Sequence, residues 1–583
     1  MMIRIDFENK SMVFKDPIKV FLSKNIDSIK HNLDEIMSFI DQRYYAVGYL
    51  SYESSEGFNI FNKTKSYKDN ELPLLLFGIF EKYSIPQEEE NISFTHNKLE
   101  LESNTTIDEY NKSISYIKQQ IEEGNTYQTN YTIQFNSKFY GDPSAYYRFL
   151  QKNNRANYCA YIQFEDLNIL SISPELFFKL EGEVITTKPM KGTTARGINF
   201  QGDKLKLEDL FSEKNQAENM MIVDLLRNDL SRISEPGTVS VTKLFEAEKY
   251  PTVWQLTSTI QSNIKKNTTL YHMFQALFPC GSITGAPKAS TMDIIANIER
   301  APREVYCGTI GYIEPSLNKA VFSIPIRTLT INKNKASYGV GGGVTWDSTD
   351  VGEYSEVLEK TAILNSSSKI PEYLIESLLL ESGKFFLLDE HLERLYNSAQ
   401  YFDFEFNGSV IKDNLIELSQ LSLGGEYKII IRLKVNGEFN IESNQISSDM
   451  QILNLDLTTK NVNSYNVYLY HKTSNRSHFP RVYEGKEYLL FNERGEITEF
   501  VNGNVVLFID NKWVTPKVSA GLLPGTMRGY YLRENFITED TILIEDVGKA
   551  KKIAFINSVR KWISIDQGVF SKLKDSINAL DQQ

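Results

Sequence analysis

The sequence is poor in the residues that usually build disulfide and metal sites. Its 583 residues include three cysteines and six histidines. Cys159, Cys280 and Cys307 are too few and too scattered for a disulfide scaffold or a CxxC metal site. The histidines show no HExxH or paired-ligand spacing, so zinc chemistry is not expected. A reducing, cytoplasmic environment is the simplest expectation.

Long apolar runs and an excess of positive charge are missing as well. No stretch of ~18 apolar residues predicts a transmembrane helix. The first residues also lack the apolar region of a signal peptide. With 63 Lys and Arg against 75 Asp and Glu, the formal net charge is −12. We therefore expect neither nucleic acid nor a membrane as a partner.

What is present is the composition of a globular protein, with 41% hydrophobic and 24% charged residues. At ~150 residues per domain, the length suggests roughly three to four domain-sized units. The polar segment NSSSKIP at 365–371 predicts a boundary between residues 1–365 and residues 371–583. Both parts mix helix-like runs, such as 106–121, with strand-like runs, such as 160–164, 308–313 and 319–329. The expected fold class is α+β.

A first segment of interest surrounds Lys191, in KPMKGTTARG at 188–197. A lysine beside a Gly-Thr turn is most often a solvated loop residue. A lysine in a desolvated pocket, however, loses its proton more easily and becomes an amine nucleophile. The residues alone leave both interpretations open.

A second segment places a carboxylate on the apolar face of a predicted helix. Glu218 shares that face with Ile222 and Leu225. A carboxylate that points inwards must be paired or must bind a metal. An ion pair, for example with Arg227, and a metal site are equally compatible with this pattern.

Two further segments are rich in glycine. GSITGAPK at 281–288 precedes a helix-like run and could offer backbone N–H groups to an anion, although an ordinary turn has the same pattern. GVGGGV at 339–344 precedes a helical stripe of Glu353, Glu356 and Lys360. Alone, this stripe is typical of a surface salt-bridge ladder. Opposite Glu218, the same carboxylates would form an oxygen-ligand site suited to Mg²⁺.

In this order, the four segments resemble the chorismate-utilising enzymes: anthranilate, aminodeoxychorismate, isochorismate and salicylate synthases. YYAVGYLSYES, TYQTNYT, SISPELFF, YCGTIGY and IPIRTL extend the resemblance over most of residues 1–365. It implies antiparallel sheets with outer helices and chorismate as substrate. It also implies Mg²⁺ on Glu218 and Glu356, with Glu353 reached through water, and substrate contacts from Thr284, Tyr306, Arg327, the Gly341 backbone and Lys360. A dianionic substrate needs such a cation clamp, and Mg²⁺ would help the C4 hydroxyl to depart.

Two positions discriminate within this family. Lys191 matches the lysine of the PIKGT-like motif of aminodeoxychorismate synthases, where anthranilate synthases have alanine. The resemblance implies that this lysine adds at C2 as the hydroxyl leaves C4, after which ammonia enters at C4. Gln128 stands where isochorismate synthases place the lysine that activates water. Amination para to the ring carboxylate is therefore predicted.

The sequence departs from the family pattern in places. Gln255 replaces a histidine of many relatives, which leaves a proton relay by that residue in doubt, and Asn215 stands where some relatives have an acidic residue. No cysteine lies in the Gly-rich nucleophile turn of a glutaminase. Ammonia is therefore expected from a separate glutamine amidotransferase subunit, or from solution.

The second part carries a different set of motifs. Arg394 lies on an amphipathic helix, where an arginine is by default a surface ion pair. Lys472 lies in YHKTSNR, Glu499 follows a turn, and GLLPGTMR at 521–528 is typical of an anion-binding turn. Together they resemble the fold-type-IV pyridoxal-phosphate family, which includes branched-chain and D-amino-acid aminotransferases and aminodeoxychorismate lyase.

This second resemblance covers about 371–565 and implies a two-lobed domain that binds pyridoxal 5′-phosphate. Lys472 would be the Schiff-base lysine and Glu499 the partner of the pyridine nitrogen. Arg394, Gly525 and Thr526 would hold the phosphate. Lys472 must be neutral to react, which partial burial favours. The resemblance also implies a homodimer formed through this domain.

The motifs of the second part do not separate a lyase from a transaminase. An amine-bearing ring product of the first part would be a natural substrate for the second, although this is an association rather than geometry. We therefore predict a bifunctional enzyme of 4-aminobenzoate synthesis, upstream of folate. The alternatives are a transaminase in the second part, anthranilate-type amination, and a scaffold without catalysis. The intact candidate residues Lys191, Glu218, Glu356, Lys472 and Glu499 argue against a scaffold.

Overall fold

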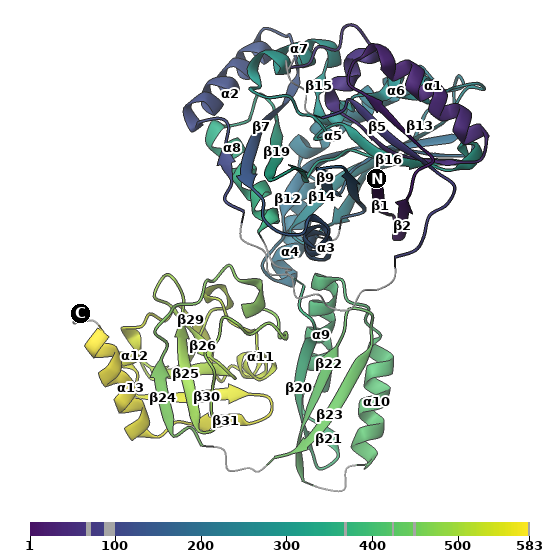
Figure 1. The fold of residues 1–583 in the computed structure, drawn as a ribbon. Helices are drawn as coiled ribbons and strands as arrows, with labels where there is room; N and C mark the ends of the chain where they lie inside the picture. The colour runs from purple at the N-terminus through teal and green to yellow at the C-terminus, as the bar shows by residue number, and fades with distance from the viewer. Residues whose placement is uncertain are drawn as a thin grey trace. The chain divides into compact units, whose positions relative to one another are not determined.

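A computed structural model describes residues 1–65, 72–86, 99–154, 156–365, 370–421, 425–446 and 451–580. The chain forms two compact units (Figure 1). The first comprises Met1–Ala195 and Leu207–Lys369, and the second comprises Arg196–Lys206 and Ile370–Gln583. Residues 366–369 of the predicted boundary lie outside the described residues. The sequence gives no sign that Arg196–Lys206 packs with the second unit.

Two large antiparallel sheets form the first unit. One has the strand order β15 (Gly285–Ala286), β7 (Gln128–Lys138), β19 (Lys335–Val344), β18 (Thr328–Asn332), β9 (Leu167–Ser173), β8 (Tyr158–Phe164), β1 (Met2–Phe7), β2 (Lys10–Lys15), with β6 (Glu102–Ser103) on β7. The other has the order β12 (Met190–Ala195), β14 (Val253–Asn263), β11 (Val184–Lys188), β10 (Leu176–Glu181), β17 (Lys319–Ser323), β16 (Thr309–Ile313), β4 (Tyr45–Leu50), β5 (Leu75–Phe80), β3 (Lys19–Ser23), with β13 (Ser240–Lys249) on β14.

The single strand predicted over 319–329 is wrong in detail. β17 and β18 belong to different sheets. Pro325 cannot donate to a strand ladder, and Arg327 has a φ of 52°. The break between the two strands places Arg327 at the end of one sheet rather than within it.

Helices cover the sheets of the first unit. α2 begins with the predicted capping box, in which Thr106 and Glu109 satisfy each other's backbone N–H groups. Its buried residues Tyr110, Ile114 and Ile117 follow the predicted helical period. Because such faces are apolar, they pack against the sheets and form the cores of the unit. The helices are α1 (Asp27–Asp41), α2 (Ile107–Glu122), α3 (Pro143–Asn154), α5 (Glu213–Ser231), α6 (Leu270–Leu277), α7 (Lys288–Ile298) and α8 (Asp350–Thr361). The helix α4 (Phe200–Leu210) begins in the segment assigned to the second unit and ends in the first.

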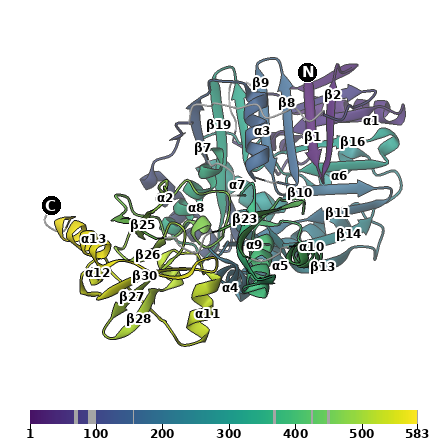
Figure 2. The same cartoon turned by 90° about the horizontal axis from the view of Figure 1, so that it is seen from below.

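The second unit has two lobes with separate cores. In the first lobe, α9 (Leu388–Phe402) and α10 (Gly408–Leu421) accompany the sheet β21 (Lys384–Phe385), β20 (Leu374–Glu381), β22 (Glu426–Leu433), β23 (Phe439–Gln445). The second lobe contains the sheets β24 (Asn454–Leu457), β25 (Lys486–Phe491), β26 (Ile497–Phe500) and β29 (Thr538–Asp540), β28 (Lys512–Pro516), β27 (Asn504–Ile509), β30 (Lys552–Asn557), β31 (Lys561–Ser564). Its helices are α11 (Thr526–Arg533), α12 (Asp546–Lys549) and α13 (Gln567–Leu580), of which α12 and α13 lie side by side (Figure 2).

The mixture of sheets and covering helices confirms the α+β fold class. None of the described helices is long and apolar enough to cross a membrane.

Candidate active sites

Lys191 lies on the edge strand β12, at an irregularity in its pairing with β14. The register shifts between Met190 and Thr193, and Gly192 has a φ of 90°, which favours glycine. A Cβ atom on Gly192 would also lie 3.0 Å from the Asn215 side chain. The bulge therefore depends on Gly192 and sets the direction in which the neighbouring Lys191 points.

Lys191 meets two other predicted segments at one point. A Cβ atom placed on Gly343 of β19 would lie 3.0 Å from Lys191 Nζ and would collide with the amide of Gln128 on β7. The absent side chain at Gly343 thus leaves room for both. Gln128 is buried, and its Oε1 has no hydrogen-bond partner among the described residues. Lys191 and Gln128, which discriminate within the family, are neighbours in space.

Carboxylates surround Lys191. Desolvation lowers the pKa of Lys191, and Glu175, Glu218 and Glu356 act in the opposite direction. Glu175 is buried, and Ser282 Oγ donates a hydrogen bond of 2.7 Å to its Oε1. Burial raises the pKa of Glu175 to about 7, although Ser282 and Lys191 favour the ionised form. This carboxylate can therefore accept or release a proton near neutral pH.

Glu175 was not among the residues singled out from the sequence. The only signal is a carboxylate inside the apolar run SISPELFF, which a structural ion pair would produce equally well.

The predicted metal ligands line the same region from two helices. Burial raises the pKa of Glu218 on α5, and Glu356 on α8 adds to this effect. Arg227, considered above as the partner of Glu218, instead donates to Asp224 at 2.9 Å. A Cβ atom on Gly342 would lie 2.8 Å from Glu353 Oε2 and 4.0 Å from Glu356 Oε1. Facing carboxylates suit a divalent ion, and the lysines Lys191 and Lys214 also favour the ionised form of Glu218.

The side chains of these carboxylates are not close enough together to form a complete metal-binding site. Within the described ranges, no group of three His, Cys, Asp or Glu side chains is close enough to hold a metal ion. Glu356 Oε1 instead accepts from Lys360 Nζ at 2.6 Å, and Lys360 also donates to the Gly341 carbonyl at 2.8 Å. Burial would raise the pKa of Glu356, but Lys360 outweighs it and the pKa is lowered. The link from Lys360 to Gly341 joins two predicted substrate contacts.

The other predicted substrate contacts lie on nearby loops and strands. Tyr306 is buried and packs on Gly339, where a Cβ atom would collide with its ring. Desolvation lowers the pKa of Arg327, which the phenols of Tyr338 and Tyr250 oppose. Thr284 is fully buried, and its hydroxyl donates to the Cys280 carbonyl at 3.0 Å, which fixes the glycine-rich loop. Its hydroxyl proton is therefore already engaged.

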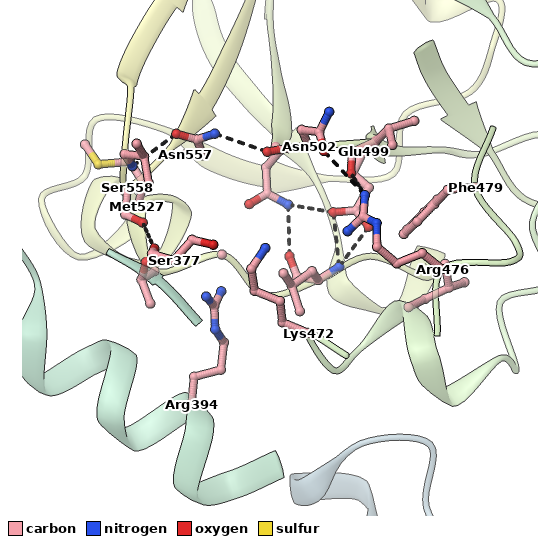
Figure 3. Close-up of a pocket in the computed structure, with 18 of the residues that line it drawn as sticks. Ser377, Arg394, Lys472, Arg476, Phe479, Glu499, Asn502, Met527, Asn557 and Ser558 are labelled. Atoms are coloured by element: carbon pink, nitrogen blue, oxygen red, sulfur yellow. Dashed lines mark hydrogen bonds between the residues drawn. The ribbon is translucent and has the colours of Figure 1, made fainter. Parts of the chain in front are cut away.

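In the second unit, Lys472 lies in a cavity of about 330 Å³ lined by both lobes. The Lys472 carbonyl accepts from the Ile375 N–H at 2.9 Å, which anchors its loop to β20. Desolvation lowers the pKa of Lys472 to about 8, and Arg394 contributes in the same direction. Figure 3 shows Lys472 in the middle of the cavity, with Arg394 on one side and Arg476 on the other. Its amine lines the cavity, and the lowered pKa makes its neutral form more available than in an ordinary lysine.

Glu499 faces the cavity from the end of β26. The Leu523 N–H donates to both of its oxygens at 3.2 Å, and Asn504 Nδ2 donates at 3.3 Å. Burial raises the pKa of Glu499 to about 8. Such a carboxylate gains from a protonated ring nitrogen that comes to lie beside it. Asn504, which also binds the Leu523 carbonyl at 2.9 Å, has no sequence signal beyond its place in the motif.

The predicted phosphate cradle is built around the start of α11. Gly525 is the N-cap residue, and because it has no side chain, it makes no capping hydrogen bond to the helix. The first N–H groups of the helix can therefore bind an anion. Arg394 donates to Glu376 at 2.8 and 2.7 Å, and His391 Nδ1 lies 2.6 Å from the same carboxylate. Thr526 Oγ1 lies 3.2 Å from His391 Nε2. This chain of contacts fixes both Arg394 and Thr526 at the cavity.

Arg394 is therefore not the surface ion pair that its helix suggests, because its side chain is only 13% exposed. Burial would raise the pKa of Glu376, but Arg394 and His391 lower it to about 2. A lysine with a pKa lowered to about 8, a buried carboxylate and an open helix N-terminus together fit pyridoxal phosphate.

The chain is similar to known proteins of two families. Residues 5–366 match the family model of the chorismate binding enzyme, and residues 373–567 match that of amino-transferase class IV. Aminodeoxychorismate synthase component 1 of Salmonella typhimurium is 39% identical over 260 residues, which are 44% of this chain and 57% of that protein. The protein of the same name from Bacillus subtilis is 30% identical over 403 residues, 62% of this chain and 84% of that protein.

A likeness to a solved structure extends over the same region. Anthranilate synthase component I from Streptococcus pneumoniae has a TM-score of 0.55 and 24% identity, covering 63% of this chain and 92% of that chain. This likeness shows the fold. The match to the Salmonella protein spans a little over half of that protein's length. By its residues 5–366, the chain belongs to the chorismate-binding enzyme family, and an amino-transferase class IV region follows in the same chain.

Proposed function

We propose that the chain carries out two consecutive steps of 4-aminobenzoate formation. The first unit would convert chorismate and ammonia into 4-amino-4-deoxychorismate, and the second would release pyruvate and 4-aminobenzoate. The observation that carries the proposal is the desolvated Lys191 among carboxylates, next to Gln128 and Gly343. Relatives named aminodeoxychorismate synthase component 1 support the same reaction.

In the first step, Lys191 acts as the nucleophile. Glu175 takes the proton from the lysine, and the neutral amine adds at C2 of chorismate as the hydroxyl leaves C4. Ammonia then adds at C4, and the lysine leaves from C2. Gln128 carries no basic group to activate water at this position. The adduct therefore reacts with ammonia rather than with water.

The remaining residues bind the charged groups of chorismate. Mg²⁺ bound by Glu218 and Glu356, with Glu353 through water, would supply positive charge to the ring carboxylate and to the departing hydroxyl. Tyr306, Arg327, Lys360 and the Gly341 backbone would hold the enolpyruvyl side, with Thr284 supporting its loop.

In the second unit, pyridoxal phosphate would supply an electron sink for the amino group of the intermediate. Arg394, Gly525 and Thr526 would hold the phosphate, and Glu499 would hold the ring nitrogen in its protonated form. Lys472 would anchor the cofactor and would then take the proton from C4 of the substrate. Loss of that proton and of pyruvate makes the ring aromatic. We also propose that this unit forms a homodimer.

Ammonia would come from a separate glutamine amidotransferase. The cysteines of this chain are all buried. Burial raises the pKa of Cys159 to about 12, of Cys280 to about 11 and of Cys307 to about 12. Thiols of this kind are poor nucleophiles at neutral pH, so none suits glutamine hydrolysis.

The test combines purified protein with chorismate, Mg²⁺, ammonium and pyridoxal phosphate and identifies the products by chromatography. Equal amounts of 4-aminobenzoate and pyruvate are expected, and chelation of Mg²⁺ should stop chorismate consumption. The Lys472→Ala variant should accumulate aminodeoxychorismate and release no pyruvate. Accumulation by the unaltered protein would assign transamination to the second unit. Anthranilate as product would contradict the role of Lys191.

A further inference from the structure

The cavity around Lys472 has a strong imbalance of charge. Glu499 is its sole carboxylate among the described lining residues. The cationic side chains that line it are Arg394, Lys428, Lys472, Arg476 and Arg560. Because like charges repel in a poorly solvated space, bound anions would stabilise such a cluster.

Some of these cations already have partners. Arg394 is held by Glu376 through two hydrogen bonds. Arg476 donates to the Val501 carbonyl at 2.8 Å, and Glu499 favours its charged form. These two arginines flank Lys472 in Figure 3. The charge of each is therefore offset, at least in part, by a carboxylate of the protein.

Lys428 is different. It lies on β22, opposite Leu379 of β20, and in the described part of the chain its ammonium group has neither a hydrogen bond nor an ion pair. Desolvation lowers the pKa of Lys428, and the charged groups that add to this effect are all arginines: Arg560, Arg476 and Arg432. Arg432 is itself paired with Glu442. Lys428 therefore lines the cavity around Lys472, and the charged groups that act on it are cationic.

Arg560 reaches the same part of the cavity from the other lobe. Its N–H donates to Asn557 Oδ1 at 2.7 Å in the turn after β30. In that turn, Ser558 Oγ donates to the Ser377 carbonyl of β20 at 3.4 Å (Figure 3). β20 is the strand paired with β22, so the turn brings Arg560 to the strand pair that carries Lys428.

We infer that Lys428 and Arg560 form a subsite for a second carboxylate, which makes the cavity selective for dicarboxylic amino substrates. The inference rests on the proposed function in one respect, that the substrate amine reacts at Lys472. Simple amino acids such as alanine carry one carboxylate, whereas aminodeoxychorismate carries two. A monocarboxylate would leave Lys428 unpaired, so the structure favours the dianion.

The test measures binding to the cofactor-loaded full chain by calorimetry, with isophthalate as the dicarboxylate probe and benzoate as the matched monocarboxylate. A charge-assisted pair of 1.5–3 kcal/mol corresponds to a preference for isophthalate of about ten- to a hundredfold. Lys428→Met should remove this preference and leave benzoate binding unchanged. Arg560→Met is a second variant at the subsite, so the test does not depend on one protein folding.

Lys434→Met is the matched control. Lys434 directly follows β22, but its ammonium is exposed and pairs with Glu438 at 2.9 Å. This variant should keep the full preference for isophthalate. Equal binding of the two probes by the unaltered chain would overturn the inference, as would a preference that survives both Lys428→Met and Arg560→Met.

Failure of the subsite and failure of the proposed lyase activity give different results. Pyruvate release from aminodeoxychorismate is measured separately from probe binding. A preference for isophthalate without pyruvate release would support the subsite and contradict the lyase. Pyruvate release without any preference would contradict the subsite alone.

Discussion

Lys191 and Lys472 are both desolvated, and in both the desolvation lowers the pKa, but the charges around them differ in sign. Lys191 is opposed by Glu175, Glu218 and Glu356, which favour its protonated form. The neighbours of Lys472 are mainly cations, and its pKa falls to about 8. The two lysines are therefore made reactive in different ways. In the first unit a carboxylate beside Lys191 can act as a base, whereas in the second unit neighbouring cations lower the pKa of Lys472.

The difference corresponds to the chemistry proposed for each unit. A lysine that must attack a carbon and later leave needs a group that takes and returns its proton, and Glu175 provides this group. A lysine that anchors a cofactor needs to be neutral before the ligand arrives, which the surrounding cations favour. In the proposed reaction, the same cations would then bind the anionic groups of cofactor and substrate.

The largest effect is expected from Lys191→Ala. Loss of a covalent nucleophile typically costs about 10³-fold or more. Formation of 4-aminobenzoate from chorismate should fall by about that factor. Pyruvate release from supplied aminodeoxychorismate should not change. Both rates are followed by chromatography.

The control for Lys191→Ala is Lys243→Ala, which alters an exposed lysine paired with Glu246. A Lys191→Ala protein that still forms anthranilate from chorismate would show that amination occurs at the other ring position. It would also make the lysine a residue that merely lines the site.

A smaller effect, of about 10²-fold, is expected from Glu175→Gln. Burial raises the pKa of Glu175 to about 7, so its carboxylate is ionised above that pH and protonated below it. Only the ionised form can accept a proton from Lys191. The rate of chorismate consumption should therefore fall as the pH drops through about 7, and this pH dependence should be absent in Glu175→Gln.

Ser282→Ala provides a matched control for this prediction. Ser282 donates to Glu175 and stabilises its ionised form, so its removal should shift the fall in rate to higher pH. A pH profile that keeps its acid limb in Glu175→Gln would contradict the role of this carboxylate.

The comparison also shows what a sequence can predict. The helix α2 follows from its capping box and its apolar period, because both are local patterns. The candidate residues follow from motifs, but the proximity of Lys191, Gln128 and Gly343 is visible only in the structure. The partners of these residues do not follow. Ser282 and Glu175 are far apart along the chain and meet only through the fold of the two sheets.

Arg394 gives the same lesson in the second unit. Its helix predicts a surface ion pair, whereas its partner Glu376 lies on β20 and is 1% exposed. In the run EYLIESLLL, the period of two places Glu376 on the same face as Leu374 and Leu378, which are both buried. A carboxylate on an apolar face signals a buried partner, but the sequence does not say which one.

The smallest expected effect concerns the pH dependence of cofactor capture. Only neutral Lys472 can react with the cofactor, and desolvation lowers its pKa to about 8. The rate at which cofactor-free protein captures pyridoxal phosphate, followed by absorbance, should therefore rise with pH through about 8. Lys428 is among the cations that lower this pKa, so Lys428→Met should move the rise to higher pH, and the exposed Lys434→Met should not. A midpoint near the ordinary lysine value in the unaltered chain would show that the cations do not prepare Lys472. The two lysines would then differ only in the carboxylates that surround Lys191.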